Sequence, residues 1–177
     1  MTCIVGLVDG QKVLIGADSA GVGGLDIQNR KDVKVFTNGD FVMGCTTSFR
    51  MIQLLQYKLS PPKRHPDVDV MRFMVTDFVE AVRGLFRDGG FATKDREAES
   101  GGTFLVGHAG RLFCIGSDYQ VGERADGFDA CGCGDSYALG SMACTADAPP
   151  RDRLQRALET AAHFSAGVRG PFVFAEK

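Results

Sequence analysis

The sequence predicts an α+β fold in which two stacked, mainly antiparallel sheets lie between two layers of helices. Strand-like segments fill the first 46 residues and return between residues 102 and 132, and an amphipathic helical pair follows each strand-rich region. A last apolar segment ends the chain. Because a sheet and a helix each bury one apolar face, the two sheets must stack and helices must cover both outer faces. The expected architecture is a four-layer α-β-β-α sandwich.

The first strands are predicted from short apolar and β-branched segments that are separated by tight-turn signals. The dipeptides Asp9-Gly10 and Asn38-Gly39 are typical of two-residue hairpin turns. These turns divide the first 46 residues into a predicted β-meander. Its strands are expected at 2–9, 12–18, 20–27, 33–37 and 41–46.

The helices are predicted from apolar side chains that recur three or four residues apart. The clearest stripe runs from Met71 to Leu85, where Asp67 is the expected N-cap and Asp88-Gly89-Gly90 the expected end. Pro149-Pro150 precedes the first turn of the last helix, a position that suits proline. The helices are expected at 48–59, 67–88, 134–145 and 151–166.

The second half of the chain repeats the order of strands and helices, so each half is expected to supply one sheet and one helix pair. Residues 94–100 are strongly charged and are predicted to form a solvated loop. No linker interrupts the 177 residues, which favours one domain over residues 1–177. The later strands are expected at 102–108, 111–116, 118–123, 128–132 and 171–174.

Composition excludes several classes of function. The net charge is -2 and the pI is about 5.9, so we expect no nucleic-acid partner. No apolar segment is long enough to span a bilayer, and no signal peptide is recognisable, which favours a cytoplasmic protein without a membrane partner. The six cysteines include a lone CxC at Cys131-Gly-Cys133, which is too little for a zinc site. We expect buried, reduced thiols.

Thr2 is the first residue whose type suggests chemistry. If Met1 is removed, Thr2 carries a free α-amine beside its own hydroxyl, which places a base and a nucleophile in one residue. A fixed cation nearby would lower the pKa of that amine, and the cation would itself need an anion in a packed interior. Asp18 ends the apolar strand expected at 12–18, and Lys34 points away from its apolar neighbours in the strand expected at 33–37. Taken singly, Asp18 could be a turn residue and Lys34 a solvent-facing charge.

Taken together, these residues resemble a known family. The spacing of Thr2, Asp18 and Lys34, with the segments T-x-I-V-G and G-A-D-S, is similar to that of the proteasome β-subunits. That family includes the peptidase subunit of the bacterial two-component ATP-dependent protease and belongs to the N-terminal nucleophile hydrolases, which have the four-layer sandwich. The segments V-M-G-C-T-T-S-F-R and A-C-G-C-G-D-S-Y-A-L-G extend the resemblance over most of the chain.

The resemblance implies a role for each matching residue. Thr2 would attack the peptide carbonyl with assistance from Asp18 and Lys34, and a backbone amide of Thr47 or Ser48 would form the oxyanion hole. Two matching positions depart from the family pattern. Cys133 stands where the family has a serine close to the N-terminal amine, and Ser165 stands where an aspartate is expected. His163 is the nearest residue that could substitute for that aspartate.

The resemblance also implies assembly and partners. It predicts a homo-oligomeric ring or double ring that degrades unfolded polypeptides supplied by a separate ATP-dependent unfoldase, because the sequence has no P-loop of its own. No cofactor is required, although a monovalent or divalent cation near the C-terminal loop is allowed. Two alternatives stay open: an inactive, structural ring protein, and an N-terminal nucleophile amidohydrolase acting on small amides. Cys3 as the nucleophile is a minor variant.

Overall fold

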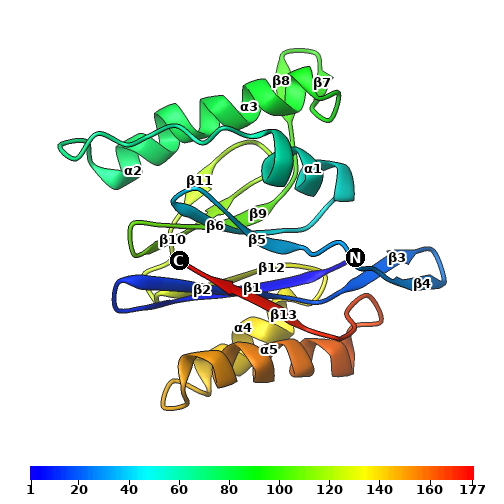
Figure 1. Cartoon of the computed structure of the whole chain (residues 1–177). Coiled ribbons are helices and arrows are strands. Elements are labelled where there is room, and N and C mark those ends of the chain that lie inside the picture. The colour runs from blue at the N-terminus through cyan, green and yellow to red at the C-terminus, as the bar shows by residue number, and fades with distance from the viewer.

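Two sheets stacked face to face form the middle of the molecule, and each is covered by helices on its outer side (Figure 1). The computed structural model describes all 177 residues. The predicted four-layer α-β-β-α sandwich is therefore confirmed. No helix is long and apolar enough to cross a membrane.

The first sheet has four strands, and every neighbouring pair in it is antiparallel. The β1–β2 hairpin lies at its centre, as the Asp9-Gly10 turn predicted. Strands from the end of the chain complete both sides of the hairpin. In spatial order the strands are β12 (Phe128–Gly132), β1 (Cys3–Asp9), β2 (Lys12–Ala17) and β13 (Val173–Glu176).

The second sheet has five antiparallel strands and joins segments from both halves of the chain. The expectation that each half supplies its own sheet was therefore wrong, as was the single N-terminal meander. The open edges of the β1–β2 hairpin are paired by β12 and β13 instead of by their sequence neighbours. In spatial order the strands are β11 (Val121–Gly122), β10 (Arg111–Ile115), β9 (Phe104–His108), β6 (Phe41–Cys45) and β5 (Val35–Asn38).

The helical layers follow the predicted pairs with three differences. Asp69, not Asp67, caps the second helix, because its side chain accepts a hydrogen bond from the Arg72 amide at 2.9 Å. Both helices of the first pair contain a π-helical turn, which the apolar stripes could not reveal. The last helix begins one residue early, at Pro150. The segments are α1 (Phe49–Gln53) with η1 (Leu54–Lys58), α2 (Val70–Phe73) with η2 (Met74–Phe78) and α3 (Val79–Asp88), α4 (Asp135–Ala143) and α5 (Pro150–Phe164).

Two small hairpins replace predicted elements. The strand expected at 20–27 is a hairpin of β3 (Ala20–Gly23) and β4 (Asp26–Asn29), which turns at a glycine of φ 59°. The loop expected at 94–100 contains β7 (Thr93–Asp95) and β8 (Ala98–Ser100). Their side chains are mostly exposed, so neither segment shows the burial periodicity that predicts a strand.

Three hydrophobic cores fill the three interfaces between the four layers. A core rich in phenylalanine packs the first helices on the five-stranded sheet, and an aliphatic core packs α4 and α5 on the other sheet. Between the sheets lies a smaller core, which includes Ile4 and Ile15. A Cβ at Gly44 would lie 2.5 Å from Ile4 Cγ2. Glycine is therefore needed there for the two sheets to approach closely.

The cysteines differ in part from the expectation. All six are free, and Cys3, Cys45 and Cys131 are buried as predicted. However, Cys133 and Cys144 are exposed. Both lie at the ends of α4, where the chain reaches the surface.

Candidate active site

Thr2, Asp18 and Lys34 meet in one buried cluster at the end of the sandwich where β1 begins. Lys34 Nζ lies 2.9 Å from Thr2 Oγ1 and 2.9 Å from Asp18 Oδ1. The exposed fractions are 6% for Thr2, 1% for Asp18 and 3% for Lys34. The three predicted residues are therefore brought together by hydrogen bonds and shielded from bulk water.

The strand pairing explains why residues so far apart in sequence meet. In the antiparallel β1–β2 pair, Ile4 lies opposite Ala17. Thr2, which precedes β1, and Asp18, which follows β2, are therefore close to each other. Asp18 Oδ1 accepts a hydrogen bond from the Cys3 amide at 3.0 Å, and Oδ2 accepts one from the Ala20 amide at 3.1 Å. Two backbone amides and one ammonium group thus satisfy the buried carboxylate.

Lys34 makes the contacts of a protonated lysine. Its Nζ donates to Thr2 Oγ1, to Asp18 Oδ1 and to the Ala20 carbonyl, the last at 2.6 Å, so all three ammonium hydrogens have acceptors. Burial lowers the pKa of Lys34, and the negative charge of Asp18 opposes that shift. The residue lies immediately before β5 rather than inside the expected strand 33–37.

Met1 is still attached to Thr2 and changes the contacts of both its hydroxyl and its nitrogen. The Thr2 hydroxyl donates to the Met1 carbonyl at 2.5 Å, and the Thr2 nitrogen is a peptide amide that donates to Cys133 Sγ at 3.3 Å. An amide nitrogen has no basic lone pair. In this form of the chain Thr2 has its hydroxyl beside a cation but lacks a base on its own nitrogen.

Cys133 lies where the resemblance placed it, next to the main chain of Thr2. Besides accepting from the Thr2 amide, its thiol donates to the Thr2 carbonyl at 3.4 Å and lies 3.5 Å from Ser165 Oγ. Gly132 makes this approach possible, since its φ is 105° and a Cβ there would lie 2.2 Å from the Thr2 carbonyl oxygen. His163 is exposed and packs edge-on against Phe164, away from this contact.

The segment expected to supply the oxyanion hole forms a strained turn. Thr47 has φ 55°, and the Ser48 amide donates back to the Thr46 carbonyl at 2.6 Å. The Thr47 amide has no acceptor in the chain. The Thr47 hydroxyl is fixed between Thr46 Oγ1 and the Thr103 amide. Of the two predicted amides, only that of Thr47 is free in this conformation.

A small pocket opens beside Thr2. Its volume is about 120 Å³, and Lys34 and the turn 46–48 form part of its wall. Phe49 and Ile52 of α1 supply an apolar side. The Arg30 guanidinium lies 3.9 Å above the Phe49 ring and is paired with Asp32, so a charged edge adjoins the apolar wall.

Three contributors to the site could not be found by considering side-chain chemistry. The Ala20 carbonyl binds Lys34 through the backbone, and alanine gives no signal of such a role. Gly132 is recognisable only as a glycine beside Cys133 until its φ is known. From the sequence, Phe49 would be taken for a core residue of an amphipathic helix, although in the structure it lines the pocket.

The site offers no side-chain cluster for a metal ion. No group of three or more histidine, cysteine, aspartate or glutamate side chains gathers anywhere in the chain in a way that could hold one. The burial of Cys3 raises the pKa of its thiol, and its side chain packs in the core beneath α4 and α5. Cys3 is therefore a poor candidate for the nucleophile.

Comparison with known proteins identifies the fold. No protein-family model matches the sequence, and no curated protein is detectably similar to it. Solved structures do match over nearly the whole chain. The structure of BPH from Thiobacillus denitrificans superposes with a TM-score of 0.83 at 19% identity, covering 99% of this chain and 97% of that one. The chain has the fold of the proteasome β-subunits.

Two further proteasome-type structures match less closely. HslV from Trypanosoma brucei has a TM-score of 0.68 at 16% identity, with 99% of this chain and 98% of that chain covered. Anbu, an ancestral beta-subunit from Yersinia bercovieri, has a TM-score of 0.67 at 18% identity, with 99% and 81% covered. The resemblance to the proteasome β-subunit fold, inferred from Thr2, Asp18 and Lys34, is thereby confirmed for the fold.

Proposed function

We propose that this chain is a threonine-type peptidase subunit that cleaves peptide bonds through Thr2 once Met1 has been removed. The observation that carries the proposal is the position of Lys34 Nζ, 2.9 Å from both Thr2 Oγ1 and Asp18 Oδ1. A buried ion pair is costly compared with apolar packing, and the packing of the two sheets does not require a hydroxyl beside it. The arrangement suits an activated hydroxyl nucleophile.

In the proposed reaction, Thr2 Oγ1 attacks the carbonyl carbon of a peptide bond and gives its proton to the free α-amine of Thr2. The Lys34 cation stabilises the negative charge that develops on Oγ1 and lowers the pKa of the amine. Asp18 holds Lys34 in place. The amine then donates the proton to the leaving nitrogen, and water hydrolyses the ester that remains on Thr2.

The Thr47 amide is the donor that suits the oxyanion best, because it has no acceptor in the chain. One such donor is worth about 3–4 kcal/mol in other hydrolases. For the Ser48 amide to contribute, it would have to release the Thr46 carbonyl, to which it donates at 2.6 Å. We expect the Ser48 amide to release the Thr46 carbonyl when a substrate binds in the adjacent pocket.

Removal of Met1 is the activating step in this proposal. It would convert the Thr2 amide into an amine at the same position, close to Cys133 Sγ. It would also free the Thr2 hydroxyl from the Met1 carbonyl and widen the pocket, which Met1 helps to line. A small residue after methionine permits this removal.

We extend the proposal to assembly. The chain would form a ring or double ring with copies of itself and receive unfolded polypeptides from a separate ATP-dependent unfoldase. The support is the fold shared with Anbu, described as an ancestral beta-subunit, and with HslV. In addition, the BPH of Thiobacillus denitrificans has been solved in complex with epoxomicin, at a TM-score of 0.83 to this chain. We expect a peptide epoxyketone to react with Thr2 here.

The test compares peptide hydrolysis by the chain lacking Met1 with that of two variants at the same position. Thr2→Ser keeps the hydroxyl and should retain hydrolysis, whereas Thr2→Ala should abolish it. Fluorogenic peptides and small acyl amides are assayed in parallel, and native mass spectrometry reports the oligomer. Equal activity of Thr2→Ala would contradict the proposal. Hydrolysis of small amides alone would favour the amidohydrolase, and an assembled but inert ring would favour the structural protein.

A further inference from the structure

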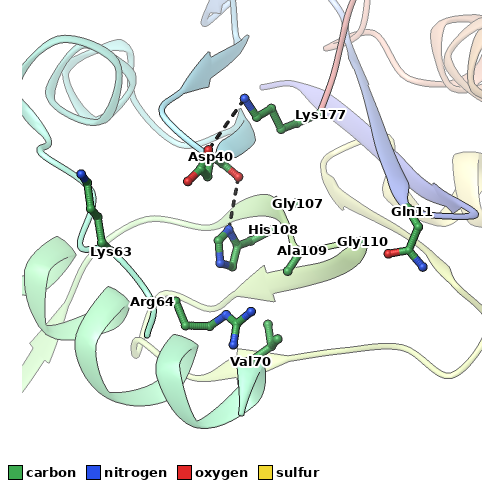
Figure 2. A pocket seen from close by; sticks show the side chains of 10 residues that line it. All are labelled: Gln11, Asp40, Lys63, Arg64, Val70, Gly107, His108, Ala109, Gly110 and Lys177. Carbon is green, nitrogen blue, oxygen red and sulfur yellow. Dashed lines mark hydrogen bonds and ion pairs between the residues drawn. The ribbon is translucent and has the colours of Figure 1, made fainter. Parts of the chain in front are cut away.

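An exposed thiol lies at the proposed active site and has no chemical step in the proposed reaction. It belongs to Cys133, which contacts the main chain of Thr2. A larger cavity, of about 680 Å³, lies at the far end of β1, where three hairpin turns meet the loop between η1 and α2 (Figure 2). No cysteine lines that cavity. A thiol next to the proposed nucleophile is therefore a feature of the Thr2 end of the sandwich alone.

Cys133 Sγ is held against the main chain of Thr2. It accepts a hydrogen bond from the Thr2 nitrogen at 3.3 Å, donates one to the Thr2 carbonyl at 3.4 Å and lies 3.5 Å from Ser165 Oγ. The antiparallel pairing of Cys3 with Gly132 keeps Thr2 and Cys133 adjacent in the folded chain. A hydroxyl could make the same contacts, but only a thiol can be oxidised.

Removal of Met1 would change both partners of this contact. The Thr2 nitrogen, 3.3 Å from Cys133 Sγ, would become a primary amine and hence a nucleophile. This separation lies within the ~3–3.5 Å between reacting atoms in a near-attack arrangement. Met1 and Cys133 also pack on the same face of Gly167, since a Cβ built there would lie 2.5 Å from Met1 Cβ and 2.7 Å from Cys133 Sγ. Loss of Met1 therefore opens space beside the thiol.

We propose that Cys133 is a site of reversible oxidation, at which hydrogen peroxide converts the thiol into a sulfenic acid and the free α-amine of Thr2 then forms an S–N bond with the same sulfur. Sulfenic acids are known to condense with a nearby backbone nitrogen to give a sulfenamide. The inference rests on the removal of Met1 in the proposed function. It adds a regulatory modification to that same site.

Both steps balance with peroxide as the only oxidant. In the first step, the ionised sulfur attacks one peroxide oxygen and the O–O bond breaks. The hydroxide that leaves takes up the proton lost by the thiol, so the products are the sulfenic acid and water. In the second step, the lone pair of the Thr2 amine attacks the sulfur and the S–O bond breaks. The leaving hydroxide takes one amine proton and departs as water.

The S–N bond would switch the proposed reaction off, because the lone pair that accepts the Thr2 proton is now next to sulfur and the amine is no longer free. A small thiol would switch it on again. Its sulfur attacks Cys133 Sγ, the S–N bond breaks, and the amine regains a proton. A second molecule of the thiol then reduces the mixed disulfide and restores the Cys133 thiol.

The other cysteines are poorly placed for this chemistry. Burial raises the pKa of the thiols of Cys3, Cys45, Cys114 and Cys131, which disfavours the thiolate that peroxide oxidises. Cys144 is exposed, but it lies at the opposite end of α4 from Cys133. Cys144 is therefore the matched control for an exposed thiol that has no amine beside it.

Intact-mass spectrometry of the reduced chain lacking Met1, before and after treatment with hydrogen peroxide at pH 8, tests the proposal. The mass should fall by about 2 Da, because two hydrogens leave as water forms, and dithiothreitol should reverse the change. Alkylation of the denatured product should find one of the six thiols blocked, whereas a disulfide would block two. Fragmentation of the digested product should join Thr2 to Cys133.

Peptide hydrolysis is measured on the same samples. It should fall by about 100-fold or more in the modified chain, because its general base is lost, and should return with dithiothreitol. Cys133→Ser should show neither the loss of about 2 Da nor a change in the ratio of hydrolysis after and before peroxide. Cys144→Ser should behave as the native chain in both measurements. In Cys3→Ala the fall in mass should persist, which separates the S–N bond from a disulfide with Cys3.

Three results would overturn the inference: a mass that does not fall, a fall that persists in Cys133→Ser, and a fall that is lost in Cys3→Ala although the melting temperature is unchanged. Hydrolysis by the untreated chain tests the proposed function separately. Full hydrolysis without an S–N bond would contradict the inference alone. An S–N bond in a chain that hydrolyses no peptide would support the modification and contradict the peptidase.

Discussion

Replacing Lys34 with methionine measures the energy of the buried ion pair on which the candidate site is built. Methionine keeps most of the length of the lysine stem and removes only the charged group. In the native chain that group bridges Thr2, Asp18 and the Ala20 carbonyl, and the side chains of Lys34 and Asp18 are 2% and 0% exposed. The variant leaves the Asp18 carboxylate buried without its counterion.

The expected magnitude follows from the distance. Two unit charges 2.9 Å apart attract by about 6 kcal/mol at an effective dielectric constant of ~20. Desolvation offsets part of this, and removing one partner of a buried pair typically costs 3–5 kcal/mol. The amides of Cys3 and Ala20 still support Asp18, which places the loss at the lower limit. We expect the free energy of unfolding to fall by about 3 kcal/mol, or roughly 6–12 °C in melting temperature.

Urea unfolding followed by circular dichroism is the assay, at one fixed protein concentration because self-association would change the apparent stability. A double-mutant cycle adds Asp18→Asn and the pair Lys34→Met/Asp18→Asn. The double variant should cost clearly less than the sum of the single variants, because each single variant leaves one buried partner unpaired. The matched control is Lys12→Met, which breaks an exposed pair with Glu176 at 3.2 Å.

The control should lose less than about 1 kcal/mol, as exposed pairs do. The reasoning would be refuted by a Lys34→Met variant as stable as Lys12→Met. It would also be refuted by a cycle in which the two single effects simply add, since that would mean that Lys34 and Asp18 do not interact in the folded protein.

Three further predictions concern the surroundings of the same cluster. Gly132→Ala should lower the melting temperature by several degrees and suppress peptide hydrolysis, because φ is 105° and the new Cβ would meet the Thr2 carbonyl; an unchanged melting curve would contradict the described backbone. Burial lowers the pKa of Lys34 below 10.5, so between the folded value and 10.5 the unfolded chain binds more protons and the free energy of unfolding rises with pH. Burial raises the pKa of the thiols of Cys3, Cys45, Cys114 and Cys131, which makes the free energy of unfolding fall with pH in the same range. Urea titrations from pH 8 to 10.5 should therefore show a more positive slope in the native chain than in Lys34→Met, and parallel slopes in the two would argue against the assignment to Lys34. Cys133→Ser should preserve kcat/KM for a peptide, whereas Cys133→Val should lower it about fivefold through loss of a hydrogen bond to Thr2; equal values for the two variants would make the thiol contact irrelevant.

The layers of the fold could be predicted because the spacing of apolar residues in the sequence shows which faces of the strands and helices are buried. Strands and helices of the sandwich carry apolar side chains with periods of 2 and 3.6, and these periods place most segments within a few residues of their observed bounds. The exposed hairpins β3–β4 and β7–β8 bury little and have no such pattern. They were therefore missed or taken for a loop.

The sequence predicted where the strands lie better than it predicted which strands pair with each other. Nothing in the composition of β1 indicates that β12, more than 100 residues away, lies on its free edge. A β-branched segment offers the same hydrogen bonds to any partner. The choice is set by how the two helix pairs connect the sheets, so the expectation of one sheet for each half failed although the layers were right.

The candidate site could be predicted where side chains carry the chemistry. A hydroxyl at Thr2, a carboxylate at Asp18 and a lysine among apolar neighbours are unusual enough to suggest a cluster, and the structure brings them together. The backbone contributions escaped prediction. The carbonyl of Ala20 and the turn that directs the Ser48 amide to Thr46 depend on dihedral angles, not on residue type.

The central claim is that Thr2 acts as an N-terminal nucleophile, and intact-mass spectrometry after incubation with a peptide epoxyketone tests it most directly. This probe forms a stable adduct only with a free α-amine and its neighbouring hydroxyl. The account predicts a chain that lacks Met1 and carries one adduct, which is lost in Thr2→Ala. A chain that lacks Met1 and stays unmodified, or an adduct that persists in Thr2→Ala, would contradict it.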